Sequence, residues 1–371
     1  MAYIPSVADD RPTVSVGMVG YGFMGKAHSN AFKTIPYIFW PDGAQIELAA
    51  IAGRSEERVA EAATRYGFGR YTTDWHDIVE DPEIQVFDNV APDAAHFAPT
   101  LAAVQAGKHV VCEKPLATTV ADAKTLERAA AEAGVLNLTC FNYRFVPAVR
   151  LARDIIASGD LGDIYTANFR YAQEWRTDPN GELPSWTGAL DIIGCHAIDL
   201  ARFLVGEISD VSAILSNPVT TETRGEPIDT VSAVLRFANG AAGTLQATLI
   251  APGRKNLLAL EINGSKGSLS WDLENLNILE RYDSSREGFS RILVNEAHHA
   301  LAAPWWPSGH ILGWEHSHAN MLAHFLDAVT GRADVGPDAA TFVDGARVAV
   351  ISEAVKRSAA EGRTLSVASV D

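Results

Sequence analysis

The first third of the chain alternates short apolar runs with segments of helical periodicity. The apolar runs predict five strands, at residues 14–20, 46–52, 86–90, 109–112 and 135–141. Between them, apolar residues at helical spacing predict helices at 24–34, 55–66, 97–106 and 119–133, the second of them capped by Ser55. Strands that alternate with helices in this way predict crossover units and a parallel sheet that is covered on both faces.

After about residue 150 the pattern changes to alternation. Apolar residues at 231, 233, 235 and 237 alternate with Thr230, Ser232 and Arg236, Asn239-Gly240 follows, and the alternation resumes through residue 249. This pattern predicts a hairpin with one buried face and one wet face. A second hairpin is predicted at 258–271, and helices at 196–204, 318–329 and 342–360. We therefore expect an antiparallel sheet with helices on one side.

These patterns predict an α/β protein of two domains. A chain of 371 residues is too long for one ordinary domain. We expect a dinucleotide-binding, Rossmann-type domain with a parallel sheet over residues 1–138. An α+β domain with a large, mainly antiparallel open sheet should follow over residues 139–371, and we assign substrate binding and oligomerisation to it.

Composition and net charge limit the kinds of molecule that we expect the protein to bind. Hydrophobic residues make up 47% of the chain, enough for a real core, and the formal net charge is −16. That charge repels nucleic acid and anionic membranes, so we expect neither as a partner. The three cysteines (Cys112, Cys140 and Cys195) form no C-x-x-C pair, which argues against a disulfide framework or a metal site. The N-terminus does not resemble a secretory signal, and we expect a cytoplasmic protein.

The segment Gly20–Gly25 (GYGFMG) follows the first predicted strand and opens the first helix. Glycines there allow a tight turn and let backbone N–H groups approach a pyrophosphate, so the segment predicts dinucleotide binding. An acidic residue at the end of the second strand would indicate NAD. Gly53 occupies that place, and the following Arg54 could meet a 2′-phosphate. We expect NAD and leave NADP open.

Two further motifs carry polar chemistry. Glu113-Lys114-Pro115 follows the fourth strand, at the sheet edge where open parallel sheets bind ligands. A lysine there can donate to a substrate hydroxyl and lower its proton affinity. His196 stands at the start of a predicted helix, and an imidazole with a pKa of about 6.5 suits the removal of a hydroxyl proton.

In order and spacing, these motifs resemble the glucose–fructose oxidoreductase / inositol dehydrogenase / rhizopine-catabolism (Gfo/Idh/MocA) family. The resemblance covers nearly the whole chain and extends to the segments Ala91–His96 and Phe141–Arg144. Within the family, Phe23–Ser29 and Gly313–His316 look closest to bacterial dehydrogenases of levoglucosan, glycosides and inositol.

The resemblance implies a role for each matching residue. Lys114 would orient and polarise the substrate hydroxyl, and His196 would be the acid/base. The residues implied to line the cofactor are Gly20, Gly22, Phe23, Met24, Gly25, Arg54, Pro92, His96, Glu113 and Lys114. Those implied on the substrate side are Asn142, Tyr143, Arg144, Trp175, His196 and His316.

The sequence departs from the family beside the acid/base. The family usually has an aspartate four residues before the histidine, and Ile192 stands there. Asp191, one residue earlier, is our candidate for the catalytic carboxylate. It would sit about 100° further round a regular helix. The carboxylate is therefore missing, displaced, or restored by an irregular turn.

The expected function is oxidation of a ring hydroxyl of a sugar, glycoside or cyclic polyol, with hydride transfer to NAD(P). Three alternatives stay open: a redox-neutral NAD-dependent glycoside hydrolase, a reductase or oxidoreductase that holds its cofactor tightly, and a non-catalytic cofactor-binding sensor. An anionic sugar is a further option, with Arg144, Arg176 and Lys255 as candidate ligands. The resemblance also implies a homodimer or homotetramer that pairs through the second sheet.

Overall fold

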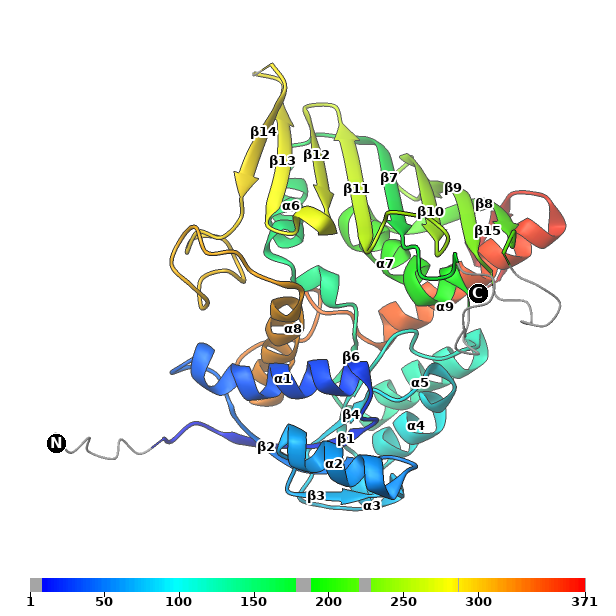
Figure 1. Ribbon diagram of the computed structural model, residues 1–371. Helices are drawn as coiled ribbons and strands as arrows, with labels where there is room; N and C mark the ends of the chain where they lie inside the picture. Colours follow the sequence, from blue (N-terminus) through cyan, green and yellow to red (C-terminus); the bar gives the residue numbers. More distant parts are fainter. Residues whose placement is uncertain (1–8, 178–187, 220–227, 286, 371) are drawn as a thin grey trace.

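The computed structural model describes residues 9–177, 188–219, 228–285 and 287–370, which form two sheets (Figure 1). The first is six-stranded, in the order β3-β2-β1-β4-β5-β6, and every pairing in it is parallel. This confirms the predicted parallel sheet. Its strands are β1 (Thr13–Val19), β2 (Gln45–Ala52), β3 (Arg70–Thr72), β4 (Val86–Asn89), β5 (His109–Cys112) and β6 (Asn137–Thr139).

Helices connect these strands, and local signals fix their ends. The Ser55 hydroxyl accepts a hydrogen bond from the N–H of Arg58 at 3.5 Å, as the sequence predicts for a cap. Gly134 ends the fifth helix with a left-handed φ of 65°. The helices are α1 (Phe23–Ile38), α2 (Glu56–Tyr66), α3 (His76–Val79), α4 (Phe97–Gln105) and α5 (Val120–Ala133).

The second sheet has nine strands in the order β14-β13-β12-β11-β7-β10-β9-β8-β15. Both predicted hairpins are present, as β9/β10 and β11/β12. Within this second sheet, β7 and β10 form the one parallel pair among the described strands. The strands are β7 (Ile164–Ala172), β8 (Ile208–Ser216), β9 (Thr230–Phe237), β10 (Ala242–Thr248), β11 (Leu257–Gly264), β12 (Gly267–Asp272), β13 (Ile278–Asp283), β14 (Phe289–Leu293) and β15 (Leu365–Ser366).

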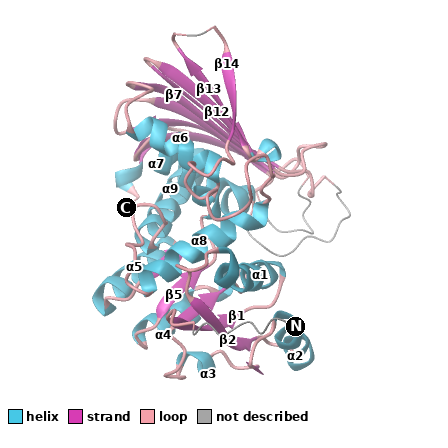
Figure 2. Ribbon diagram, turned by 90° about the vertical axis from the view of Figure 1, so that its left-hand side faces the viewer, coloured by secondary structure: helices cyan, strands magenta, loops and turns pink. Residues whose placement is uncertain are grey.

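Helices cover one face of this sheet, the face turned toward the first sheet (Figure 2). They are α6 (Pro147–Ala157), α7 (Cys195–Leu204) and α9 (Phe342–Glu361). Alternate residues of β9 are buried in the core that these helices share, while Ile214 and Val234 on the other face are 72% and 59% exposed. The alternation read from the sequence is thus a one-sided core.

Helix α8 (Trp314–Val329) returns from the second sheet to the first. It packs against α1, and its Met321 and Phe325 share a core with Val16 and Met18 of β1. The start of α9 likewise packs against α5. We keep the division at residues 138 and 139 as a proposal, and we note that C-terminal helices complete the cover of the N-terminal sheet.

Candidate active site

The glycine loop joins β1 to α1 at the carboxyl edge of the first sheet. Gly20 has a φ of +105°, and a Cβ there would lie 2.6 Å from the carbonyl oxygen of Val90. A Cβ on Gly25 would lie 2.7 Å from the carbonyl oxygen of Gly20, whereas Gly22 has open space around it. Among the described residues no side chain caps α1, and its first turn holds no acidic residue. Its first N–H groups therefore suit the diphosphate of a dinucleotide.

The end of β2 shows why an acidic residue is missing there. A Cβ on Gly53 would overlap the ring of Tyr21. The Tyr66 hydroxyl holds that segment by donating to the carbonyl oxygen of Tyr21 at 3.1 Å. Arg54 follows and is exposed, so it is the charged group that this edge offers to an adenosine ribose.

Lys114 follows β5 and reaches across to the second half of the molecule. Its Nζ donates to the carbonyl oxygen of Ile192 at 3.0 Å, and its main-chain N–H donates to Glu113 Oε2 at 3.0 Å. Burial lowers the pKa of Lys114, but nearby acidic groups, Cys195 and Glu113 foremost, more than offset this and raise it. The side chain is therefore an ammonium at neutral pH.

His96 holds together the two loops that carry this edge of the site. Its ring is fully buried, with Nδ1 2.6 Å from the carbonyl oxygen of Pro115 and Nε2 2.9 Å from that of Ala91. Pro92 lies on the exposed surface of the first of these loops. His96 thus shapes the cofactor side from behind.

His196 lies in the first turn of α7 among aromatic rings. Its ring centroid is 4.8 Å from that of Tyr143 and 5.8 Å from that of Phe141. Burial, then the charge of Lys114, lowers the pKa of His196 well below 6.5. Its Nδ1 is buried with no hydrogen-bond partner among the described residues. A neutral imidazole next to an ammonium can accept a proton from a hydroxyl that the ammonium polarises.

A chain of uncharged hydrogen-bonding groups extends from this histidine. The Tyr143 and Tyr171 hydroxyl oxygens are 2.8 Å apart, and Tyr171 donates to Asn256 Oδ1 at 2.8 Å. Gln173 Nε2 donates to the same oxygen at 2.6 Å, and Trp175 Nε1 donates to Gln173 Oε1 at 2.6 Å. The sequence analysis identified Tyr143 and Trp175 and missed the other three. The spacing of two residues between 171, 173 and 175 was the available signal.

Helix α8 contributes two residues that the sequence analysis did not assign. Trp314 stacks on Phe23 of the glycine loop at 5.4 Å and meets the ring of His318 at 4.3 Å. Both ring nitrogens of His318 are buried without a partner in the described part of the chain. Burial, then the charge of His28, lowers the pKa of His318 to about 3. Asn142 connects to the same helix by donating to Ser317 Oγ at 2.9 Å.

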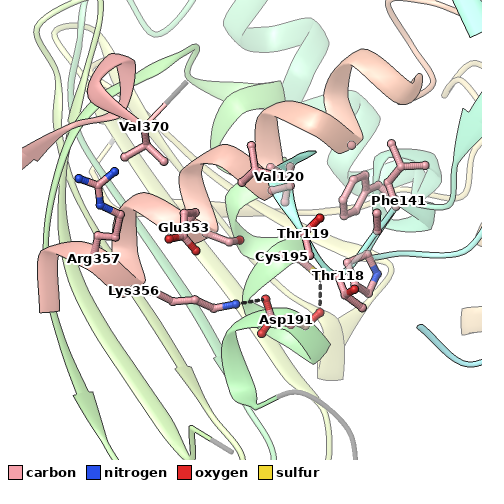
Figure 3. A pocket seen from close by; sticks show the side chains of 17 residues that line it. Thr118, Thr119, Val120, Phe141, Asp191, Cys195, Glu353, Lys356, Arg357 and Val370 are labelled. Carbon is pink, nitrogen blue, oxygen red and sulfur yellow. Dashed lines mark hydrogen bonds and ion pairs between the residues drawn. The ribbon is translucent and has the colours of Figure 1, made fainter. Parts of the chain in front are cut away.

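The structure places Asp191 in an ion pair on an irregular turn. Leu190–Gly194 form a π-helical turn, and the Asp191 carboxylate accepts from Lys356 Nζ at 2.9 Å. The pair lines a cavity of about 450 Å³ between this turn, residues 115–120 and α9 (Figure 3). At Ile192, where a carboxylate was expected, a backbone carbonyl accepts from Lys114 instead. The Asp191 carboxylate is thus paired with Lys356, and its catalytic role stays a prediction.

Two residues predicted on the substrate side have partners within the protein. Arg144 is buried in an ion cluster, with Nε 2.9 Å from Asp199 Oδ2 and Nη2 3.1 Å from Asp344 Oδ1. These partners satisfy its charge inside the protein. His316 accepts a hydrogen bond from the N–H of Gly313 at 3.0 Å and so caps α8. Both side chains thus make polar contacts inside the protein, and their contact with a substrate stays a prediction.

The chain is similar to known oxidoreductases along nearly its whole length. The model of an oxidoreductase family with an NAD-binding Rossmann fold matches residues 14–140, and that of the GFO/IDH/MocA C-terminal domain matches residues 149–270. Levoglucosan dehydrogenase of Pseudarthrobacter phenanthrenivorans is 38% identical over 382 residues, covering 94% of this chain and 96% of that protein.

Two other comparisons bear on the fold and the substrate class. A solved structure of levoglucosan dehydrogenase with NADH and levoglucosan matches with a TM-score of 0.91 and 37% identity, over 96% of this chain and 99% of that one. The scyllo-inositol 2-dehydrogenase (NAD+) of Bacillus subtilis is 30% identical over 264 residues, covering 69% of this chain and 73% of that protein.

Proposed function

The chain belongs to the Gfo/Idh/MocA oxidoreductase family, and we propose that it is a net dehydrogenase of levoglucosan or a similar uncharged cyclic sugar. Its N-terminal part is an NAD-binding Rossmann fold. The chain as a whole is an NAD(P)-dependent oxidoreductase of sugars or cyclic polyols. The proposal adds the substrate, the residues that act on it, and the release of the reduced cofactor.

The observation that carries the proposal is the uncharged wall beside His196. Tyrosine, amide and indole groups there can hydrogen-bond several sugar hydroxyls, and their rings can pack on a sugar ring. The cations considered for an anionic sugar are each paired: Arg144 with Asp199, Arg176 with Asp229 at 3.1 Å, and Lys255 with Glu174. A neutral substrate fits this arrangement.

The chemistry follows from the charge states of Lys114 and His196. Bound nicotinamide supplies the hydride acceptor. The Lys114 ammonium donates to the hydroxyl oxygen of the sugar and lowers its proton affinity. His196, neutral because of burial and the nearby ammonium, accepts the hydroxyl proton. The rings of Phe141, Tyr143 and Tyr171 around His196 exclude water from the reacting carbon.

The hydrogen bond from Lys114 Nζ to the carbonyl oxygen of Ile192 orients the ammonium, as the carboxylate expected at this position would do. A carboxylate would place the ammonium and add a negative charge, whereas the carbonyl places it and adds only a dipole. The Lys114 charge is therefore less neutralised, which keeps His196 in its neutral, proton-accepting form.

Location and assembly form a further part of the proposal. No described helix is both long and apolar enough to cross a membrane. Separately, the buried free cysteines support the proposal of a cytoplasmic protein. The helix-free face of the second sheet, with exposed Ile214 and Val234, is where we propose that copies of the chain associate into dimers or tetramers.

The test is an assay with NAD and then NADP against levoglucosan, inositols, free hexoses and aryl glycosides, with product analysis of each mixture. The expected result is reduced nicotinamide formed with levoglucosan or another uncharged sugar. Release of an aglycone that requires NAD, without net reduction, would replace the proposal by a redox-neutral glycosidase. Cofactor binding with neither product would replace it by a sensor.

A further inference from the structure

A buried charge cluster beneath the site takes no part in the chemistry described so far. His28 lies on α1, one turn after the glycine loop. Its Nδ1 is 3.0 and 3.1 Å from the two carboxylate oxygens of Asp88 at the end of β4, and its Nε2 is 3.3 Å from Glu113 Oε1. The side chains of His28 and Asp88 are fully buried, and that of Glu113 is 5% exposed.

The geometry fixes the charge of this histidine. Nδ1 lies within hydrogen-bond distance of the Asp88 carboxylate, and Nε2 is 3.3 Å from Glu113 Oε1 without hydrogen-bond geometry. A carboxylate oxygen close to each ring nitrogen favours the doubly protonated imidazolium, because a bare lone pair there would be near a negative charge. Burial alone would lower the pKa of His28, but Asp88 more than offsets it and raises that pKa well above 6.5. Burial raises the pKa of Glu113, and the bond to and charge of His28 lower it to about 2. Burial, and the charge of Glu113, raise the pKa of Asp88, although the charge of His28 opposes this. The cluster therefore holds an imidazolium beside the ionised carboxylate of Glu113.

Glu113 connects the buried cluster to the main chain of Lys114. Its Oε2 accepts from the main-chain N–H of Lys114 at 3.0 Å, and its own N–H donates to the carbonyl oxygen of Asn89 at 2.9 Å. The cluster thus joins α1, the end of β4 and the loop that carries the reacting ammonium. A shift of the Glu113 carboxylate would move the main chain from which Lys114 extends.

We propose that His28 is a positioning residue for the proposed oxidation, whose imidazolium locks the Glu113 carboxylate and, through it, the main chain of Lys114. The catalytic part rests on the proposed function, whereas the charge state of the cluster can be measured without any substrate.

The other groups that face His28 supply no replacement charge. The Cys140 thiol lies after β6, and burial, with the Glu113 charge, raises its pKa to about 12. His318 on α8, with ring centroids 5.6 Å apart, is neutral because burial lowers its pKa to about 3. Without His28, the Asp88 and Glu113 carboxyl groups would be buried near each other, with the charge of Lys114 acting on Glu113. We expect such a pair to take up a proton in the acidic to neutral range.

The first experiment compares wild type with His28→Gln and with His324→Gln as a matched control. His324 on α8 contacts a backbone carbonyl, that of Val335, at 3.0 Å. We expect H28Q to fold, to bind NADH, and to lose about 100-fold in kcat with a smaller change in KM, because Lys114 is misplaced. H324Q should keep the wild-type kcat.

The pH profile separates positioning from simple packing. Glu113 stays ionised in wild type, so it contributes no limb in the assay range. In H28Q its pKa rises, and kcat/KM should acquire a new loss toward acid pH. That limb should be absent from H28Q/E113Q, where no carboxylate is left to titrate at this position. An H28Q profile parallel to wild type would overturn the proposal.

If H28Q does not fold, Asp88→Asn should show a weaker loss of kcat/KM in the same direction. A wild-type pH profile for D88N would overturn the proposal.

An activity-independent readout tests the cluster itself. NMR of isotope-labelled histidine ring nitrogens at mildly alkaline pH should show one imidazolium with both nitrogens protonated, which H28Q lacks. His28 Nε2, Glu113 Oε1 and Cys140 Sγ lie within 4.8 Å of one another, so metal analysis belongs to the same test. A neutral His28 tautomer, or one equivalent of bound metal, would overturn the proposal. If wild type oxidised no sugar, the proposed function would fail while this measurement still decided the charge state.

Discussion

The cofactor side and the sugar side of this site are built in different ways. On the cofactor side, short segments that follow β1, β4 and β5 meet at one sheet edge, where main-chain geometry does the work. On the sugar side, Tyr143, Tyr171 and Asn256 come from three separate segments and form a shared hydrogen-bond chain. The cofactor side thus depends on single positions that tolerate no other residue, whereas the sugar side divides substrate binding among several uncharged groups.

This difference teaches where substitutions should matter. Lys114 and His196 stand between the two sides, and each has one task that no neighbour can take over. A glycine of the loop has a steric task that fails with one added methyl group. Each hydroxyl in the uncharged wall beside His196 has neighbouring groups that can also hydrogen-bond the sugar. Asp191 lies outside both sides.

The largest effect should come from Lys114→Ala. Removing the ammonium that we propose acts on the reacting oxygen should lower kcat/KM by about 100- to 1000-fold, because that donor would act on developing charge. NADH binding, followed by fluorescence, should change little. Unchanged turnover would remove Lys114 from the mechanism.

His196→Asn should cost about 100-fold in kcat/KM by removing the proton acceptor. Since burial and then the charge of Lys114 depress the pKa of His196, the wild-type protein should lose activity only well below pH 6.5, as this ring becomes protonated. The pH profile of kcat/KM checks both statements. A wild-type limb centred above pH 6.5 would show that His196 is not in the environment described.

Gly20→Ala tests the main-chain side. The positive φ and the overlap with Val90 should destabilise the fold by about 1–3 kcal/mol and weaken NADH binding. Chemical denaturation and NADH titration measure the two effects. Gly22→Ala is the matched control for stability, since its Cβ would enter open space, and equal destabilisation by both variants would contradict the steric account.

Tyr171→Phe should have a smaller effect on the sugar side. Loss of one hydroxyl from a shared chain costs about 0.5–1.5 kcal/mol, which is about two- to twelvefold in KM for the sugar, with kcat nearly unchanged. Steady-state kinetics separate the two constants. A large fall in kcat with an unchanged KM would mean that Tyr171 takes part in proton transfer.

Asp191→Asn should have the smallest effect. Its partner Lys356 has a 33% exposed side chain, so the ion pair should contribute at most about 1 kcal/mol to stability. Turnover should match wild type. A loss comparable to that of the Lys114 variant would support Asp191 as the catalytic carboxylate.

Regular local patterns made much of the fold predictable. The strand–helix alternation indicated the parallel sheet, and Asn239-Gly240 between two alternating runs indicated the β9/β10 hairpin. The short elements β3 and α3 have too few residues to show a period. The parallel pairing of β7 with β10 joins residues more than seventy positions apart, so no local pattern records it.

The site was predictable where chemistry follows from a short motif. The positions of the glycine loop, Lys114 and His196 relative to the sheet and to helix α7 follow from neighbouring residues. The ion pair of Asp191 with Lys356 could not be predicted, because the partners are distant in sequence and a π-helical turn breaks the 3.6-residue period around Asp191. The ion pairs of Arg144 with Asp199 and Asp344 could not be predicted either, because these partners are also distant in sequence. Nothing near Arg144 in the chain shows that its charge is already satisfied.

The most direct test of the central claim follows the hydrogen on the oxidised carbon. Levoglucosan, or the best substrate from the panel, would carry deuterium on its ring carbons, and mass spectrometry would follow the label in the cofactor and the sugar. The account predicts one deuterium in the reduced nicotinamide for each oxidised sugar released, and none in the Lys114→Ala variant. Deuterium retained in a hydrolysed sugar, with no net reduced cofactor, would contradict it.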